Sequence, residues 1–559
     1  MLTMLRSFLL FALTALAAAQ GQPDPTIVHE FGTPGATGSF RARFHPDGAG
    51  LVFLQATDHY KSLAAKRQEK HGPGDWLALA WNGNDHGLRL VQMTPSTAFP
   101  ADPALARWNV EASGDTVKFT LDGGAGLWLE KVLRHDPKLR GFTLEIALIN
   151  KTSTATGSLD FTLLGLAPVS AAELSLFGTL AVAIAAGTDG AATTIGAAPG
   201  PSQPLALATP LSFAGSTNRF FGTFLFPKDD AARTALGAMN VDFVPAVGDE
   251  GLKVSPFSST RVRHDLRLAV PAVGAETRVA LGLYAGPKSY RVFATLPEAV
   301  RDQFRPILEY DLNSPCCFSI EMPGGRPMAK LLLWLLGIFH DVIQNWGVAI
   351  MMLTILVRGL LAPLNFRMQK SMRAYGKKMA VLKPKLDALK AQFGSDQRGY
   401  QQAMIAFQRE HKMMPPLGGC LPILLTMPVY IGLFTALRTA YDVRQEPFCA
   451  WVDDLSVPDA LVHNFLFGFD LNLLPILWIV MMLIQTLRTP LPNDPQQRQT
   501  MMIMRFMPLI FGVMLYTYAA ALLVYMVTSM VWSMIEFSVT KKILGPIDGD
   551  AAAFAPQTM

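Results

Sequence analysis

Hydrophobic and polar residues alternate one by one along the first half of the chain. Within residues 23–312, the runs 117–121 and 142–148 place apolar side chains at every second position, and Gly, Pro, Thr and Ser separate such runs. This alternation predicts strands with one buried face. Many short strands with little helical periodicity predict a large β-sandwich domain over residues 22–312.

The second half of the chain carries long apolar runs instead. A helix needs about 20 apolar residues to cross a hydrocarbon core about 30 Å thick. The run 501–540 would be about 60 Å long as one helix, so it predicts two spans joined by a turn. The sequence thus predicts an α-helical core over residues 345–545 with five spans, at 346–363, 417–437, 471–487, 501–518 and 521–540.

A shorter apolar run precedes the first span. Residues 328–339 are apolar apart from Lys330, and His340 and Asp341 then end a run that is too short to cross the membrane. We expect an amphipathic helix at 326–344 that lies in the outer interface of the bilayer. A buried core helix is the alternative interpretation.

The N-terminus predicts an export signal or a signal anchor at residues 1–20. Arg6 precedes an apolar stretch at 7–16, and three alanines at 17–19 form a small-residue cleavage pattern. This pattern leaves open whether the signal is removed or kept. The β-sandwich that follows an export signal should lie outside the cytoplasmic membrane.

The charges of the loops predict the orientation of the spans. Residues 366–416 hold eleven Lys or Arg against three acids, whereas residues 441–460 hold five acids and Arg444 alone as a base. Basic loops stay in the cytoplasm. The first of these loops is therefore expected inside and the second outside, with the tail at 546–559 in the cytoplasm after Lys541 and Lys542.

The basic loop itself predicts an antiparallel helical hairpin at 365–415. Apolar residues from Met368 to Phe393 repeat at alternating four- and three-residue steps, as in a coiled coil, and the rhythm resumes at Tyr400 after a break at 394–396. Pro384 should kink the first helix. The hairpin is either self-contained or a docking arm for a polyanion such as ribosomal RNA or anionic lipid.

Arg358 is the residue of greatest interest, because it lies within the otherwise apolar span 346–363. Twelve residues of helix after Trp346 place it about 18 Å into the hydrocarbon core. A guanidinium stays charged at any relevant pH, and intramembrane charges usually face a bundle interior or a wet cavity. The plain alternative is that Arg358 extends to the inner headgroups.

Composition excludes several classes of function. A net charge of +5 is too small to indicate nucleic-acid binding. Cys316, Cys317, Cys420 and Cys449 lack metal-ligand spacing, and a bridge between Cys317 and Cys449 stays open because Cys316 adjoins it. The ten histidines form no metal-binding cluster and no P-loop is present. We therefore expect neither a metal nor a cofactor.

Two other classes of function remain as alternatives. A secondary transporter of an anionic solute could use an intramembrane arginine, although no internal repeat or pair of interrupted helices supports it. A membrane-tethered carbohydrate-active protein could use acids of the β-sandwich such as Asp122, Glu130 and Glu145. Strand alternation more simply places Glu130 and Glu145 on a solvent face.

Four segments of the second half resemble the YidC/Oxa/Alb family of membrane insertases in sequence, order and spacing. They are NWGVAIMMLTILVRGLLAPL at 345–364, LKPKL at 382–386, PLGGCLPILLTMPVYIGLF at 416–434 and WVDDLSVPD at 451–459. Fainter matches at 217–227 and 284–290 are similar to the periplasmic domain that members from double-membraned bacteria carry. The specific part of the resemblance covers residues 282–542.

The resemblance implies a five-helix core around a hydrophilic groove that is open to the cytoplasm and to lipid but closed outwards. It implies that Arg358 is the arginine of this groove and that Thr354, Thr426 and Tyr525 face it. The family is chaperone-like rather than enzymatic. The expected partners are nascent membrane proteins, the ribosome, the Sec translocon, membrane lipids and signal-recognition targeting components, at the bacterial inner membrane.

The chain departs from the family pattern in four places. Pro415 stands where relatives commonly have Asn, and Thr426 where they commonly have Gln. Alanines at 519–521 replace the usual Pro-Ser-Gly turn before the last span, so the register of Tyr525 towards the groove depends on where that turn lies. The signal at 1–20 looks cleavable, whereas relatives typically keep it as a span.

These residues suggest a mechanism. Burying the polar flank of a nascent membrane segment costs several kcal/mol per group, and a wet, cationic groove would reduce that cost. In this hypothesis Arg358 attracts acidic residues of a short translocating tail, while Thr354 and Thr426 hydrate the path. Transfer of the client's apolar helix from water to lipid supplies the driving force. Met residues, 22 of 26 of which follow residue 320, could repack around different clients or simply fill core and lipid-facing positions.

Overall fold

The computed structural model describes residues 26–70, 72–82, 86–169, 181–198, 200–247, 254–311, 325–393, 397–410, 429, 431–434, 436–437, 440–466, 469–487 and 495–544. The chain divides into two compact units with a boundary between Leu308 and Glu309. The predicted signal at 1–20, Cys316, Cys317, Cys420 and the tail at 546–559 lie outside the described residues. Cys449 is an exposed free thiol.

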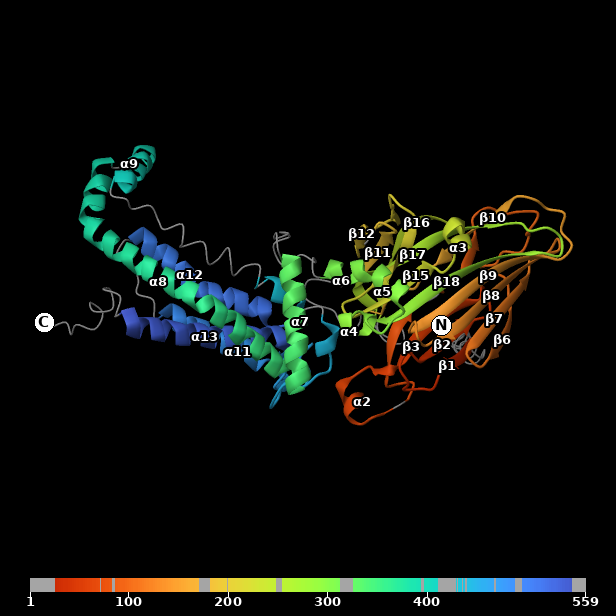
Figure 1. The fold of residues 1–559 in the computed structure, drawn as a ribbon, viewed down its shortest axis with the longest axis horizontal. Helices are drawn as coiled ribbons and strands as arrows, with labels where there is room; N and C mark the ends of the chain where they lie inside the picture. The colour runs from red at the N-terminus through yellow and green to blue at the C-terminus, as the bar shows by residue number, and fades with distance from the viewer. Residues whose placement is uncertain are drawn as a thin grey trace, which may run out of the picture. The chain divides into compact units, whose positions relative to one another are not determined.

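Antiparallel strands make up the first unit (Figure 1). Its largest sheet has nine strands. In spatial order these are β12 (Ala192–Gly196), β11 (Val182–Gly187), β14 (Leu211–Thr217), β15 (Phe221–Pro227), β18 (Glu276–Pro287), β9 (Gly141–Asn150), β8 (Leu127–Asp136), β7 (Thr116–Asp122) and β6 (Asn109–Ser113). The alternation expected at 117–121 and 142–148 is confirmed, since apolar side chains of β7 and β9 are buried at every second position.

Two smaller sheets complete the unit. One contains β13 (Gln203–Pro204), β16 (Leu236–Val247), β17 (Val254–Ala269), β10 (Ser158–Leu164) and β5 (Leu90–Gln92), and the other β1 (Ile27–Phe31), β2 (Phe40–His45), β3 (Gly50–Tyr60) and β4 (Trp76–Trp81). Strands β11 and β14 of the large sheet pack against β17, and Val262 of β17 is buried against Ala183, Ala185 and Ala214. The rings of Phe31 and Phe40 each lie 5.0 Å from that of Phe142.

Short helices pack against the sheets, and the first of them contacts β3 of the four-stranded sheet. They are α2 (Leu63–Arg67), α3 (Asp230–Ala235), α4 (Tyr290–Phe293), α5 (Glu298–Gln303) and α6 (Arg305–Asp311). Phe304, which follows α5, is fully buried, and its ring lies 5.4 Å from those of Phe213 and Tyr284 and 5.6 Å from that of Phe224. This aromatic cluster joins the helical end of the unit to β14, β15 and β18.

The second unit is helical. Its elements are α7 (Gly325–Ile343), α8 (Trp346–Phe393), α9 (Gln397–Glu410), η4 (Tyr441–Val443), β19 (Val462–Leu466), β20 (Phe469–Leu471), α11 (Leu473–Leu487), α12 (Pro495–Leu515) and α13 (Ala520–Leu544). In the described part of the chain, Trp346–Ser371 of α8 and all of α13 are long and apolar enough to cross a membrane, and Leu473–Leu487 and Arg505–Leu515 are shorter apolar helices. Of the predicted span 417–437, residues 417–428, 430 and 435 lie outside the described residues.

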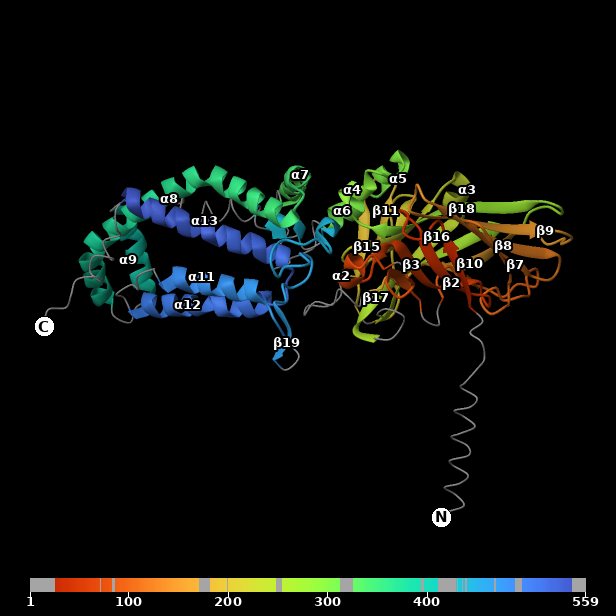
Figure 2. The same cartoon turned by 90° about the horizontal axis from the view of Figure 1, so that it is seen from below.

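The four apolar helices run alongside one another. Figure 2 shows α8 beside α13 and α11 beside α12, and each of these pairs is in contact, as are α11 and α13. Helices α8 and α13 run in the same direction, because residue pairs with the same sequence offset meet along them. The result is a bundle whose seams lie between residues far apart in the sequence.

Helix α7 crosses this bundle steeply, as Figures 1 and 2 show. Ala329, Leu332 and Leu336 are buried on the side that contacts the core. Trp334 and Val342 on another side are 63% and 78% exposed. A helix that is apolar on its free side and lies across the spans suits the predicted position in an interface.

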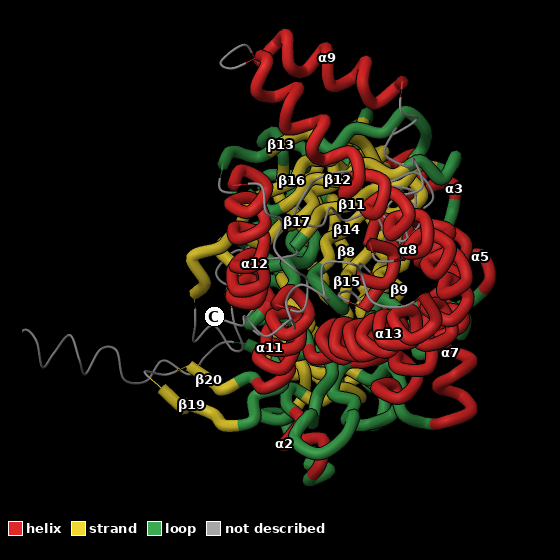
Figure 3. The backbone as a smooth tube through the Cα atoms, turned by 90° about the vertical axis from the view of Figure 1, so that its left-hand side faces the viewer, coloured by secondary structure: helices red, strands yellow, loops and turns green. Residues whose placement is uncertain are grey.

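Helix α8 is longer than the predicted first span. It runs without a break through Pro363 and Pro384 to Phe393, although the span was predicted to end at residue 363. Each proline removes one backbone hydrogen bond but does not stop the helix, and no glycine or polar turn follows Pro363. Helix α9 lies against the end of α8 (Figure 3).

The segment 451–459 caps the N-termini of two helices, α11 and α13. Asp459 Oδ2 accepts hydrogen bonds from the backbone N–H groups of Leu473 and Leu474 at 2.9 and 2.8 Å and from Trp451 Nε1 at 2.9 Å. The N–H groups of Ala520 and Ala521 donate to the carbonyls of Val457 and Leu455 at 2.8 and 2.9 Å. Helix N-termini leave such N–H groups without internal partners.

These contacts explain the turn before the last span. Helix α12 ends at Leu515 and α13 begins at Ala520, so the turn occupies residues 516–519, whereas the two spans were predicted at 501–518 and 521–540. Alanine does not break a helix by itself. Here the carbonyls of Leu455 and Val457 satisfy the first N–H groups of α13, and this external capping sets the helix start in place of a Pro-Ser-Gly turn.

Candidate functional site

Arg358 points from α8 towards α13. Its guanidinium donates a short hydrogen bond to the Ser529 hydroxyl. Arg358 itself is partly buried, and Ser529 is buried. Among the described residues no carboxylate lies within ion-pair distance of this guanidinium, so the cation inside the span has a neutral oxygen as its partner.

Thr354 and Tyr525 occupy the next layer towards the helix starts. Thr354 is 1% exposed, and its hydroxyl donates to the Ile350 carbonyl at 2.7 Å. The Tyr525 phenol interacts with Ser529 and lies within the electrostatic reach of Arg358. Arg358 and Tyr525 therefore meet at Ser529, which the sequence had not indicated, and Thr354 lies one helical turn before Arg358 on α8.

A third layer lies two turns further along both helices. The Glu536 carboxylate of α13 interacts with the Asn365 side chain of α8 and lies within the electrostatic reach of Arg358. The pairs Arg358–Ser529 and Asn365–Glu536 have the same separation in sequence. The equal offset makes one continuous seam, and Trp532 lies between these layers, against Gly359.

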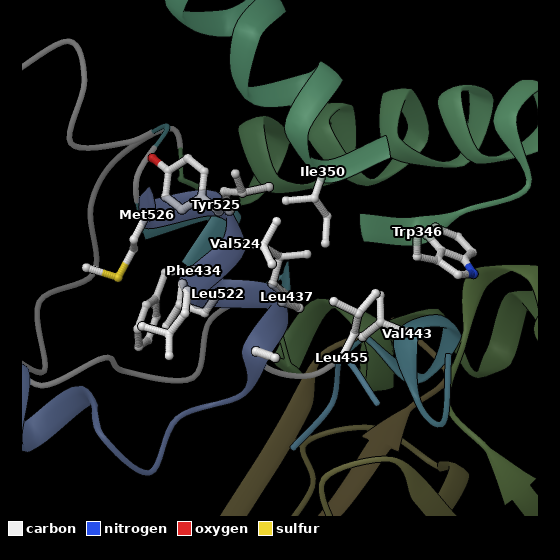
Figure 4. Packing of buried hydrophobic residues seen from close by; sticks show 14 of the residues in the cluster. Trp346, Ile350, Phe434, Leu437, Val443, Leu455, Leu522, Val524, Tyr525 and Met526 are labelled. Carbon is white, nitrogen blue, oxygen red and sulfur yellow. The ribbon is translucent and has the colours of Figure 1, made fainter. Parts of the chain in front are cut away.

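An apolar cluster fills the bundle between this seam and the helix starts. Figure 4 shows Ile350 of α8 and Val524 of α13 packed together with Leu437, Val443 and Leu455 from the segments between these helices. The ring of Tyr525 lies at the edge of the cluster, with its hydroxyl directed away from it (Figure 4). Leu353, Leu437, Leu455 and Leu523 have 1% exposure or less.

Thr426 lies outside the described residues, so its place relative to Arg358 is not described. The sequence does not mark Ser529 and Asn365 as site residues, because a serine or an asparagine near an apolar run is common. Glu536 carries a stronger one, since it is an acid inside an apolar run. Its position seven residues after Ser529 places it on the same helical face.

Glu130 and Glu145 of the β-rich unit are held in ion pairs. Glu130 lies 2.8 Å from Lys118 and 3.5 Å from Arg278, and Glu145 lies 2.8 Å from Arg278. Arg278 thus joins Glu130 and Glu145 on one face of β9 and its neighbours. No group of three metal-ligating side chains occurs in the described residues.

Several named proteins are similar to this chain in sequence. The model of the family described as 60Kd inner membrane protein matches residues 338–545. A protein named membrane protein insertase YidC from Neisseria meningitidis is 34% identical over 323 residues, which are 57% of this chain and 51% of that protein. One of the same name from Pseudomonas fluorescens is 33% identical over 306 residues, 54% of this chain and 48% of the relative.

The chain spans about half the length of the curated relatives it matches. A solved structure, titled "Active YidC insertase crystal structure with the first transmembrane domain resolved", covers 93% of both chains at 17% identity with a TM-score of 0.34, a value too low to support an argument about the fold. The family match includes Arg358, Ser529 and Glu536. The match of residues 338–545 to the model of the 60Kd inner membrane protein family confirms the resemblance found in the sequence.

Proposed function

We propose that this chain is a membrane protein insertase and chaperone of the bacterial inner membrane. It inserts nascent integral membrane proteins and helps them fold, alone or beside the Sec translocon, and it does so without enzymatic chemistry. The names of the relatives support this function. The observation that carries it is the charge of Arg358 inside a span, with the neutral Ser529 hydroxyl as its hydrogen-bond partner.

The proposed topology has five spans, with the β-rich unit in the periplasm and the C-terminus in the cytoplasm. The basic residues at 366–416 and the acidic ones at 441–460 support this orientation. The exposed apolar side of α7 supports its place in the outer interface. The contact between α8 and α9 supports a cytoplasmic hairpin at 365–415.

We further propose that Arg358, Thr354, Thr426 and Tyr525 line a hydrophilic groove that is closed outwards. The apolar cluster around Leu353 and Leu523 supports the closure, because it fills the bundle between Arg358 and the helix starts. A charge that lacks a carboxylate partner can attract an acidic residue of a client tail. The Thr354 hydroxyl, which already donates to a carbonyl, can still accept a hydrogen bond from water.

The driving force in this proposal is the transfer of the client's apolar helix into lipid. The groove only lowers the cost of carrying the polar flank across the hydrocarbon. Exposed apolar residues on the outside of α12, such as Ile510 and Val513, support direct contact of this bundle with acyl chains. The proposed partners are nascent membrane proteins, the ribosome, the Sec translocon, targeting components of the signal-recognition type and lipids.

Insertion of matched clients tests the role of Arg358. We use proteoliposomes that contain the full chain and a single-span client whose short tail carries either two Asp or two Asn. Arg358→Ala should lower insertion of the Asp client about tenfold, because it removes a charge interaction of about 1.4 kcal/mol. Arg358→Lys should retain most of the activity, and the Asn client should respond weakly to both variants.

A photoreactive residue at position 354 supplies an independent measurement. It should crosslink to a ribosome-held client segment in the wild type, because the proposed groove passes Thr354. Crosslinking at Val513, whose side chain is 74% exposed on α12, serves as a control for general lipid-side contact. Equal loss of insertion in Arg358→Ala and Arg358→Lys would remove charge attraction from the mechanism.

A further inference from the structure

Glu536 is the one acidic residue in the sequence of α13, and it faces α8 rather than the outside of the bundle. Its Oε1 atom is buried and has no hydrogen-bond partner among the described residues. The Asn365 side chain lies beside the carboxylate. A carboxylate that reaches into a helix seam with one oxygen unsatisfied is costly, so a role for it in the seam is to be expected.

The position of Glu536 relates it to Arg358. Ser529, the partner of Arg358, precedes Glu536 by seven residues, which is about 10 Å of helix. Among the described residues no ion pair joins Arg358 to Glu536, yet the guanidinium acts electrostatically on this carboxylate. Arg358 therefore lies in the field of an acid that it does not contact.

The same geometry places Glu536 closer to the inner end of the bundle. Helix α13 ends with Lys541 and Lys542 shortly after it, and the basic end is the cytoplasmic one in the proposed topology. A client tail that enters from that end passes Glu536 before it reaches Arg358. The acid thus lies on the path between the cytoplasm and the cation.

We propose that Glu536 is a specificity-determining residue that competes with the carboxylates of client tails for Arg358. This inference rests on the proposed insertase function and deepens it. The resident carboxylate weakens the attraction of Arg358 for acidic tails and repels them at the entrance. An acidic tail then binds Arg358 only transiently, because the guanidinium still interacts with the Glu536 carboxylate after the tail has left.

The proposal is tested with the full chain in proteoliposomes and the two single-span clients described above. Glu536→Gln keeps the size of the side chain and a hydrogen-bonding oxygen for Asn365 but removes the charge. We expect it to raise crosslinking of the Asp tail to position 354 about fivefold, with little change for the Asn tail. Ser538→Ala, an exposed position two residues further along the same helix, is the matched control.

The double variant Arg358→Ala/Glu536→Gln shows whether the two charges act on each other. If they do, Glu536→Gln should have no effect on the Asp tail once Arg358 is absent. An unchanged ratio of Asp to Asn crosslinking in Glu536→Gln, together with a loss in Arg358→Ala, would overturn this inference and leave the proposed function intact. No loss in Arg358→Ala for either client would overturn the proposed role of the groove itself.

Discussion

Each unit of the molecule holds a cation among apolar residues, and the surroundings of the two cations differ. Lys131 in β8 is 2% exposed, and its ammonium donates to the carbonyls of Ala49 and Leu88. The rings of Phe119 and Trp108 lie 4.9 and 5.7 Å from it. Arg358 in α8 is only partly buried and contacts one hydroxyl.

The difference indicates separate roles. Lys131 is surrounded by acceptors and aromatic faces that hold it in place, and its two carbonyl partners come from loops far apart in the sequence. It therefore joins parts of the β-rich unit. The Arg358 guanidinium has further N–H groups that can donate to another acceptor, which suits transient binding. A fully satisfied cation supports structure, whereas a partly satisfied one is available for function.

The largest expected effect is the loss of Lys131. Lys131→Ala leaves a cavity and two carbonyls without their donor, which should lower the free energy of unfolding by about 3–5 kcal/mol. Lys131→Met keeps most of the volume and should cost clearly less. Amide hydrogen exchange of β3 and β8 in the full chain measures both variants. Equal exchange in Lys131→Ala and the wild type would contradict a structural role for this ammonium.

The second prediction uses pH to separate the two cations. Burial lowers the pKa of Lys131 from 10.5 to about 7. Between these values the unfolded chain binds a proton that the folded chain does not, so this group makes the β-rich unit more stable as the pH rises. The slope is at most about 1.4 kcal/mol per pH unit, and the contribution is constant below pH 7.

Chemical unfolding at several pH values between 7 and 10 measures this slope, and Lys131→Met is the control. Subtracting the Lys131→Met curve removes the contribution of all other groups. A difference that does not change with pH would show that Lys131 keeps its charge in the folded state. Insertion activity attributed to Arg358 should show no matching slope, because a guanidinium stays protonated throughout this range.

The smallest expected effect concerns the partner of Arg358. Ser529→Ala removes the hydroxyl that orients the guanidinium and should lower insertion of the Asp client about two- to fivefold, the equivalent of one hydrogen bond of about 0.5–1 kcal/mol. Ser533→Ala, one turn later, removes a hydroxyl that bonds only the Ser529 carbonyl at 2.9 Å and is the control. Equal insertion by both variants would argue against an orienting role for Ser529.

Local patterns predicted the strands and apolar helices well. Residues 116–122 and 141–150 are strands with the expected alternation, and α7 at Gly325–Ile343 agrees with the helix predicted at 326–344. The same alternation could have identified Lys131, since Leu127, Leu129 and Leu133 are buried at the same parity in β8. Sheet order was not predictable, because strand partners such as β10 and β17 are about a hundred residues apart.

The candidate site was predictable only in part. A charge inside an apolar run identifies Arg358 without any structure. Its partner Ser529 is 171 residues away, and no local pattern specifies which face of α13 meets α8. The turn at 516–519 was displaced for a similar reason, because the carbonyls of Leu455 and Val457 that cap α13 are supplied by a distant segment.

The segment 451–459 has a consequence for how the chain itself is made. It precedes both α11 and α13 in the sequence, and it holds the oxygens of Asp459, Leu455 and Val457 that receive their first N–H groups. During synthesis these acceptors leave the ribosome before their donors. The acceptors that cap each N-terminus are therefore already synthesised when α11 and α13 emerge, so the order of translation and the order of assembly agree.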